Sequence, residues 1–189
     1  HGQALLSKAL RDFEEPKDQH DAARRAETLF IQAGQQLDAV IKDLTGKEQA
    51  QAKFERGVNY IDQARTYLDL DKVDVRRKRG ELMLLAKKLF ESMADDLTTE
   101  EGFLANAWLV KCGHELQEPK ESTKRYNKVV NTTDKTGVAA AGQRLARYFH
   151  IQYIPKDIDL KVKPLERVKL VQTEAIKWLK DFPGHHKSW

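Results

Sequence analysis

The sequence predicts an all-α protein, and three observations carry that prediction. Apolar residues recur at helical spacing through almost the whole chain. Capping residues and prolines stand where these periodic segments begin and end. The connections between them are short, so neighbouring helices are expected to pack antiparallel. We therefore expect one all-helical domain over residues 1–189 with about seven helices.

The periodic segments are expected to form helices in chain order. Their apolar stripes run from Ala26 to Leu44, Phe54 to Leu68, Leu82 to Leu97, Leu104 to Leu116, Ser122 to Val130, Ala141 to Phe149 and Val168 to Leu179. A further short helix is expected near residues 3–12. Trp108 and Trp178 fall on these stripes and are expected to be core aromatics.

Caps and prolines mark the helix boundaries. Thr45–Glu48 and Thr98–Glu101 both match capping boxes, in which a Thr hydroxyl and a Glu carboxylate satisfy unpaired backbone amides. Pro119 and Pro164 stand where a first helical turn tolerates a missing N–H. Pro183–Gly184 is expected to end the last helix.

One segment, residues 157–163, breaks the helical pattern and alternates apolar and polar residues as a half-buried strand does. No second segment of this kind exists to pair with it, and an isolated strand is not stable. We interpret it as an extended connection whose Ile158, Leu160 and Val162 lie against the helices. The chain is thus expected to comprise a repeat-like core over about 20–152, an extended connection over 153–163, a C-terminal helix over 164–181 and a tail over 182–189.

An internal repeat emerges at an offset of 36 residues. At this offset Ala105, Leu109, Lys111, Gly113 and His114 correspond to Ala141, Leu145, Arg147, Phe149 and His150, and Ala86, Phe90 and Met93 correspond to Ser122, Tyr126 and Val129. The repeated unit is a helix-turn-helix whose second helix carries small, aromatic and small or medium residues in turn.

This pattern resembles the tetratricopeptide repeat (TPR) family. The pairs Leu109–Val110 and Leu145–Ala146 match the Leu and small residue of the family's first helix, and Ser122, Tyr126 and Val129 match the Ala, aromatic and Ala of its second. Gly57 and Tyr60 match the family's Gly and Tyr at three-residue spacing. The resemblance covers about residues 82–150 and extends in part over 20–80. It implies antiparallel helix-turn-helix repeats stacked as a right-handed solenoid.

Several positions depart from the family pattern. Asn106 and Gly142 stand where the family prefers Trp, Gln117 replaces the turn Gly, and Asp134 replaces the closing Pro. The period is 36 residues rather than about 34. A helical bundle without repeats is the alternative architecture.

The resemblance also implies a concave surface lined by the first helices of the repeats. Its positions map to Leu104, Ala107, Lys111, His114 and Glu115 in one repeat and to Ala140, Gln143, Arg147, His150 and Ile151 in the next. The candidate partner-binding residues among them are Lys111, His114, Gln143, Arg147 and His150. Stacking of the cationic side chains is expected to suit an acidic peptide or a carboxylate terminus. The alternative is a solvated helix face.

Two other functions remain as hypotheses. A helical bundle could hold a metal or small ligand through His114 and His150, although neither these residues, Cys112 nor His185–His186 shows structural-zinc spacing. A free N-terminal His1 could chelate copper, but we expect no metal there.

A nucleic-acid module would rest on the basic run Arg76–Arg79. Asp71, Asp74 and Glu81 reduce the local charge of this run, and no stacking aromatics interleave it. We therefore expect a solvated segment and regard nucleic-acid binding as the weaker hypothesis.

Composition excludes further classes. The 33 Lys+Arg and 29 Asp+Glu give a net charge of +4, which does not require a nucleic acid or a membrane as partner. No apolar run reaches about 18 residues, so no membrane span is expected. Cys112 is the one cysteine, which rules out an internal disulfide. No nucleophile, phosphate-loop or zinc-protease motif is present, so we expect no catalytic residues and no cofactor.

The expected function is therefore that of a non-catalytic protein-interaction or scaffold domain within a larger protein or assembly. Its expected partner is another protein or a peptide of acidic character. Because the chain begins at His1 rather than Met, we expect a longer parent protein, and the compartment stays open between cytoplasm and bacterial envelope. The oligomeric state is also left open.

Overall fold

The computed structural model describes residues 2–3, 16–133, 137–157 and 160–184. Within these ranges the chain forms seven α-helices, a 3₁₀ turn and irregular connections, and it forms no strand, which confirms the all-α prediction. The short helix expected near residues 3–12 lies almost wholly outside the described residues. The chain divides into two compact units, His1–Met93 and Ala94–Trp189.

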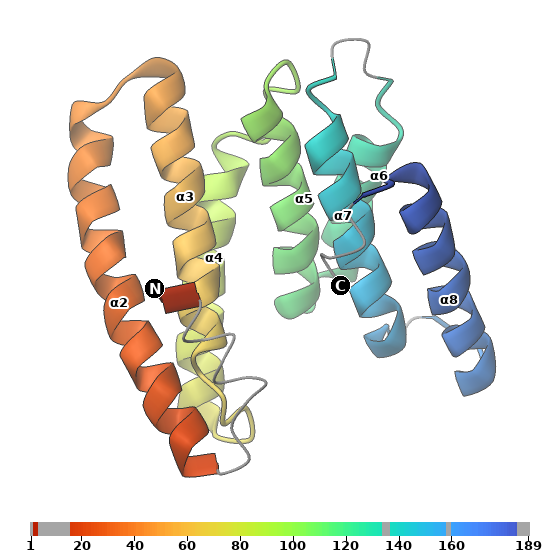
Figure 1. The fold of residues 1–189 in the computed structure, drawn as a ribbon, viewed down its shortest axis with the longest axis horizontal. Coiled ribbons are helices and arrows are strands. Elements are labelled where there is room, and N and C mark those ends of the chain that lie inside the picture. The colour runs from red at the N-terminus through yellow and green to blue at the C-terminus, as the bar shows by residue number, and fades with distance from the viewer. Residues whose placement is uncertain (1, 4–15, 134–136, 158–159, 185–189) are drawn as a thin grey trace. The chain divides into compact units, whose positions relative to one another are not determined.

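From residue 16 onward the first unit forms three helices, with the central one packed against both others (Figure 1). They are α2 (Pro16–Asp43), α3 (Gly46–Arg65) and α4 (Val73–Glu91). Gly57 on α3 provides the close contact with α4, since a Cβ at this position would lie 2.6 Å from Cζ of Phe90. The buried Arg56 ties α3 to α2 through two hydrogen bonds, of 2.8 and 2.9 Å, to the Asp38 carboxylate.

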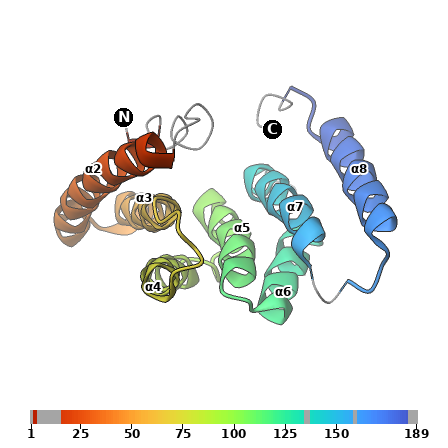
Figure 2. The ribbon, with the colours of Figure 1, turned by 90° about the horizontal axis from the view of Figure 1, so that it is seen from below.

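The second unit contains four helices and a 3₁₀ turn. They are α5 (Glu100–Glu115), α6 (Pro119–Val130), α7 (Ala140–Tyr153), η1 (Ile154–Lys156) and α8 (Pro164–Asp181). Helix α5 packs against both α6 and α7, so these three helices form a tight group. Helix α8 lies beside α7 and η1 and packs there less extensively (Figure 2).

The turn between α5 and α6 adopts the conformation in which glycine is common. Gln117, which stands where the TPR pattern has its turn Gly, has a φ of 60° in the left-handed region. The N–H of Glu118 donates to the carbonyl of Gly113 at 2.7 Å, and that of Gln117 donates to His114 at 3.1 Å. These two bonds form a Schellman motif, which satisfies carbonyls at the end of α5.

The predicted prolines are confirmed, whereas the two predicted capping boxes are wrong. Pro119 and Pro164 open α6 and α8. Thr45 precedes α3 but its side chain makes no capping bond. Thr99 caps α5 by accepting a hydrogen bond from the Gly102 N–H at 3.2 Å, because the carboxylate of Asp96 already accepts bonds from the Thr98 hydroxyl and N–H.

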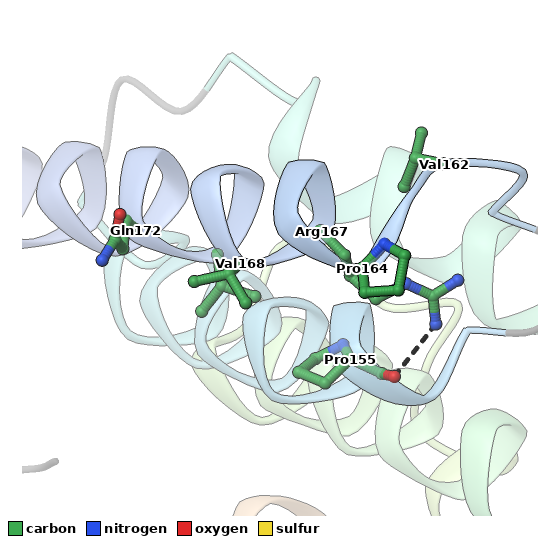
Figure 3. A pocket seen from close by; sticks show the side chains of 7 residues that line it. Pro155, Val162, Pro164, Arg167, Val168 and Gln172 are labelled. Atoms are coloured by element: carbon green, nitrogen blue, oxygen red, sulfur yellow. Dashed lines mark hydrogen bonds between the residues drawn. The ribbon is translucent and has the colours of Figure 1, made fainter.

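The connection to α8 differs in part from the predicted extended segment. It opens with the 3₁₀ turn η1, and Val162 is exposed rather than packed on the helices. Ile158 lies outside the described residues. Arg167 fastens the connection to α8, because its guanidinium donates to the carbonyls of Pro155 at 2.9 Å and Leu160 at 2.8 Å (Figure 3).

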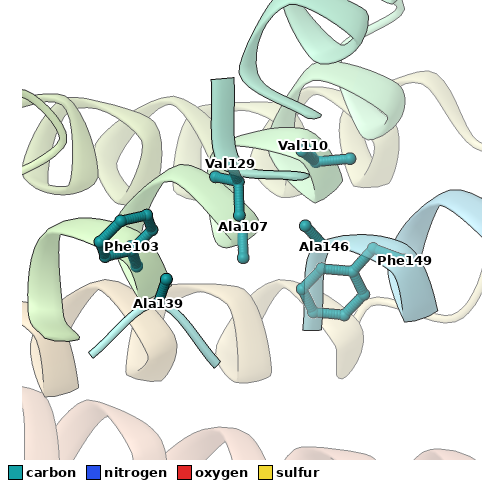
Figure 4. Packing of buried hydrophobic residues seen from close by; sticks show 7 residues of the cluster. All are labelled: Phe103, Ala107, Val110, Val129, Ala139, Ala146 and Phe149. Atoms are coloured by element: carbon teal, nitrogen blue, oxygen red, sulfur yellow. The ribbon is translucent and has the colours of Figure 1, made fainter. Parts of the chain in front are cut away.

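The core of the second unit lies between α5, α6 and α7 (Figure 4). It consists of Phe103, Ala107, Val110, Val129, Ala139, Ala146 and Phe149, with Trp108 packed against it. Two glycines allow the helices to approach closely. A Cβ at Gly142 would lie 2.6 Å from Cβ of Phe103, and one at Gly113 would lie 2.9 Å from Cβ of Ser122.

Asn106 is buried at the edge of this core, at a position where the TPR pattern prefers Trp. Its side-chain amide donates to the carbonyl of Ala94 at 2.6 Å and to that of Gly102 at 2.9 Å. The side chain therefore ties the segment before α5 to that helix. A tryptophan could not do the same, because its ring has one N–H donor and the asparagine amide has two.

Candidate functional site

The five candidate residues lie on two helices that pack side by side. Lys111 and His114 stand on α5, and Gln143, Arg147 and His150 stand on α7. We call the surface that carries these five residues the α5–α7 face. All five are half-buried. The spacings of three residues on α5 and of four and three on α7 place each set on one side of its helix.

The face is narrower than the resemblance implies. Ala107 and Ile151, which map to the same surface, are buried with 0% and 2% of their area exposed. Both belong to the interior of the second unit and are out of reach of a partner.

The two histidines each stack on a tyrosine. The His114 ring lies 4.2 Å from that of Tyr153 with an interplanar angle of 10°, and the His150 ring lies 4.5 Å from that of Tyr126 at 29°. The Tyr153 hydroxyl donates a hydrogen bond to the carboxylate of Glu115. Nε2 of His114 is buried and has no hydrogen-bond partner among the described residues.

Burial keeps both histidines neutral at pH 7. Burial, with smaller effects of His150 and Lys111 in the same direction and of Asp157 and Glu115 in the other, lowers the pKa of His114 to about 4. Burial also lowers the pKa of His150. The positive charge of the α5–α7 face at neutral pH therefore comes from its lysine and arginine, not from its histidines.

Arg147 and Gln143 are engaged within the unit. Nη1 of Arg147 lies 2.5 Å from Oδ2 of Asp181 at the end of α8, and its guanidinium lies 5.7 Å from the centroid of the Phe182 ring. The amide of Gln143 donates to the carbonyls of Val129 at 3.2 Å and Thr132 at 2.9 Å, where α6 ends. Both side chains thus hold neighbouring segments on α7.

Lys111 extends across to the neighbouring helix. Its ammonium lies 5.2 Å from the centroid of the Phe149 ring, within the range of a cation–π interaction. Lys111 and His150 both act electrostatically on His114, so the structure brings these three candidate residues together. Arg147 and Gln143 belong instead to contacts with α8 and α6.

The basic run Arg76–Arg79 lies in the first turns of α4. Arg76 donates to the carbonyls of Leu70 at 2.7 Å and Asp71 at 3.0 Å, and Arg77 lies 3.9 Å from the carboxylate of Glu81. Arg76 and Arg77 therefore have local partners. Nucleic-acid binding by this run stays a hypothesis.

Within the described residues no group of three or more His, Cys, Asp and Glu side chains is arranged to hold a metal ion. Cys112 is buried, and His150 acts electrostatically on His114. His1 and His185–His186 lie outside the described residues. Metal binding through the histidine pair thus stays a hypothesis.

Sequence reasoning missed the tyrosines and one exposed surface. The 36-residue offset pairs the histidines with each other and Tyr126 with Phe90, but it does not indicate that Tyr126 and Tyr153 stack on the histidines. The stripe that was expected to bury Val168, Ile176 and Leu179 leaves all three exposed. The available signal was that α8 carries apolar residues on more than one side.

Comparisons with protein families, with curated proteins and with solved structures find no match for this chain. Across the described ranges, no helix combines the length and the apolar character needed to cross a membrane.

Proposed function

We propose that this chain is a non-catalytic protein-interaction domain of TPR-like type, whose α5–α7 face binds an acidic peptide segment of another protein. The supporting observation is the side-by-side packing of α5 and α7, whose residues correspond at the 36-residue offset. This packing places Lys111 of one helix beside the Phe149 ring of the next. Successive first helices that share a surface are what a repeat protein uses for binding.

The chemistry of the face favours a carboxylate-bearing partner. Lys111 contributes a cation beside the Phe149 ring, and the two neutral histidines leave this cation and Arg147 as the charges of the face. Arg147 contributes less, because Asp181 already compensates its charge. We expect Lys111, whose ammonium lies beside the Phe149 ring at the junction of α5 and α7, to contribute most to affinity.

Selection from a displayed library of random peptides tests the proposal. The wild-type chain is expected to enrich acidic peptides, and Lys111→Glu is expected to weaken the enriched peptides by about tenfold or more, which corresponds to about 1.4 kcal/mol. Lys120→Glu makes the same charge change at an exposed site on α6 and serves as the matched control. Enrichment without acidic bias, or binding that is unchanged in Lys111→Glu, would refute the proposal.

A further inference from the structure

Helix α8 carries apolar residues on two sides. Trp178 faces α7 with 2% of its area exposed. On another side, Leu165, Val168, Ile176 and Leu179 are 67%, 54%, 67% and 39% exposed, and we call these four residues the outer stripe. With Val162, they make up five of the eleven large hydrophobic residues that are exposed within the described part of the chain. The exposed apolar surface is thus concentrated on α8 and its connection.

The spacing of the outer stripe suits a helical partner. Steps of three, eight and three residues place the four side chains on one side of α8, as one pair before and one pair after the exposed Gln172, over a length of about 21 Å. A row of this kind is what one helix buries against another. Because single exposed apolar residues are ordinary but an aligned row of four is not, the stripe indicates a binding surface.

A pocket opens beside the first half of the stripe (Figure 3). It has a volume of about 540 Å³ and is lined by Pro155, Val162, Pro164, Arg167, Val168, Val171 and Gln172. The guanidinium of Arg167 is turned to the carbonyls of Pro155 and Leu160, so its polar end is occupied. What remains toward the pocket is mainly apolar, which suits insertion of a large apolar side chain.

The charges on the neighbouring side of α8 indicate the character of the partner. Lys169, Lys177 and Lys180 are exposed there, against a single exposed glutamate, Glu166. Lys169 and Lys180 lie next to the outer stripe on the helix surface. Acidic residues that flank the apolar side of a partner helix would therefore meet these lysines favourably.

The same charges disfavour a second copy of this chain. An antiparallel pair of α8 helices joined through the outer stripe would bring three lysines and one exposed glutamate of each copy to one side, so like charges would outnumber opposite charges there. A flat bilayer would meet the lysines but has no fixed side chain to fill the pocket. The lysines and the pocket together favour a protein helix over both alternatives.

We propose that the outer stripe of α8 and its pocket bind an acidic amphipathic helix of another protein, which inserts one large apolar side chain beside Val168. Like the proposed function, this inference concerns protein binding. It concerns a different surface, because the outer stripe shares no residue with the α5–α7 face. The two can therefore fail separately.

A displayed library of amphipathic helices tests this surface on the full chain. The helices span about 14–18 residues, with apolar positions varied among Leu, Ile, Met, Phe and Trp and flanking positions varied between Glu and Lys. The wild-type chain is expected to enrich Glu at the flanks and an aromatic residue or Leu at one apolar position. Binding of the enriched helices is expected to fall by about tenfold or more in Val168→Asp.

Two further variants make the test specific. Lys169→Glu/Lys180→Glu is expected to reverse the selection, so that Lys replaces Glu at the flanks. Asn127→Asp adds a negative charge at an exposed site on α6 and is expected to leave binding unchanged. Circular dichroism of each variant checks that the helices are retained.

Several outcomes would overturn the proposal. These are no enrichment of any helix, equal binding to Val168→Asp, a dimer of the wild-type chain that Val168→Asp dissociates, and binding to vesicles rich in phosphatidylserine in place of helices. Lys111→Glu separates this inference from the proposed function. It is expected to retain the helices selected through α8 while losing the acidic peptides selected through the α5–α7 face.

Discussion

Helix α6 packs against the preceding helix α5 and helix α8 against the preceding helix α7, yet the two are held in different ways. Helix α6 follows α5 after a short turn and lies against both α5 and α7. Helix α8 follows α7 after η1 and a connection. Its substantial contacts are with α7 and η1. The first arrangement buries small residues along the helix crossing, whereas the second depends on one large side chain.

The residues at the two crossings differ. Gly113 lets α6 approach α5 so closely that a Cβ there would lie 2.9 Å from Cβ of Ser122. The residue 36 positions later is Phe149, whose ring lies in the core 4.9 Å from the ring of Trp108 on α5. Helix α8 meets α7 through the buried Trp178, whose ring lies 6.2 Å from that of Tyr148. A close crossing at a glycine thus holds α6, and a large buried side chain holds α8.

Removing the large side chain of α8 is expected to have the largest effect. Trp178 is buried, and its indole N–H donates to the carbonyl of Arg144 at 2.9 Å. Trp178→Ala should cost about 3–5 kcal/mol of the free energy that holds α8 on α7. Hydrogen exchange is expected to lose protection over residues 164–181 and to keep it in α5, α6 and α7.

Trp178→Phe is the matched control, because it keeps most of the ring contact and removes only the hydrogen bond. It should cost about 1 kcal/mol. If Trp178→Ala unprotected α5 and α6 to the same extent as α8, the two helices would not be held independently and the comparison would be wrong.

Adding a methyl group at the tight crossing is expected to have the next largest effect. In Gly113→Ala the new Cβ would also lie 3.1 Å from backbone atoms of Ser122, which cannot turn away as a flexible side chain can. The overpacking should cost about 1–3 kcal/mol, even though alanine favours helix more than glycine does. Denaturant unfolding of the purified variant measures the loss.

Gly80→Ala provides the control for Gly113→Ala. Gly80 also lies in a helix, but a Cβ there would meet no atom within 4 Å. This variant should gain about 0.5–1 kcal/mol from the lower backbone entropy of its unfolded chain. A shift of both variants in the same direction would contradict the account of the α5–α6 crossing.

Lowering the pH is expected to reduce the free energy of unfolding of the second unit through His114, by less than the Gly113→Ala change can. Because the folded protein favours the neutral form of His114, the unfolded chain binds more protons between its ordinary pKa of 6.5 and the folded pKa of about 4. The contribution of His114 to stability is thus complete above about pH 6.5 and declines as the pH falls toward 4. Partial exposure reduces the effect to about 1–2 kcal/mol.

The pH dependence of denaturant unfolding measures this contribution. His114→Phe keeps a ring against Tyr153 and removes the titrating nitrogen, so its stability should fall less than that of the wild type between about pH 7 and pH 4.5. Acid titration of the carboxylates affects both proteins and cancels in the difference. Parallel curves for the two proteins would show that His114 does not contribute.

Sequence reasoning reached the helices because their periodicity and their prolines are local signals. Pro119 and Pro164 stand at the first position of α6 and α8 as predicted. The capping residue of α5 could not be predicted, because Asp96 competes for Thr98 through a turn whose geometry the residue types alone do not determine. Thr98 and Thr99 are neighbours with the same side chain, so as N-caps they differ too little in energy for residue spacing alone to predict which one caps the helix.

The candidate site was predictable in its members but not in their partners. The offset placed His114 and His150 on neighbouring helices, whereas the ion pair of Arg147 with Asp181 depends on how α8 packs. Periodicity also cannot decide which of two apolar sides of a helix is buried. The sequence therefore predicted that Val168 lies on an apolar stripe but not that the stripe is exposed.

The backbone at Gln117 has a consequence for engineering this protein. A side chain in the left-handed region costs about 1 kcal/mol relative to glycine, so the α5–α6 turn retains a cost that the surrounding bonds have to overcome. Gln117 is exposed and belongs to neither proposed binding surface. Thermostabilised versions of the chain, including those needed for crystallisation or for display of new binding surfaces, can therefore begin at this turn without altering what the domain binds.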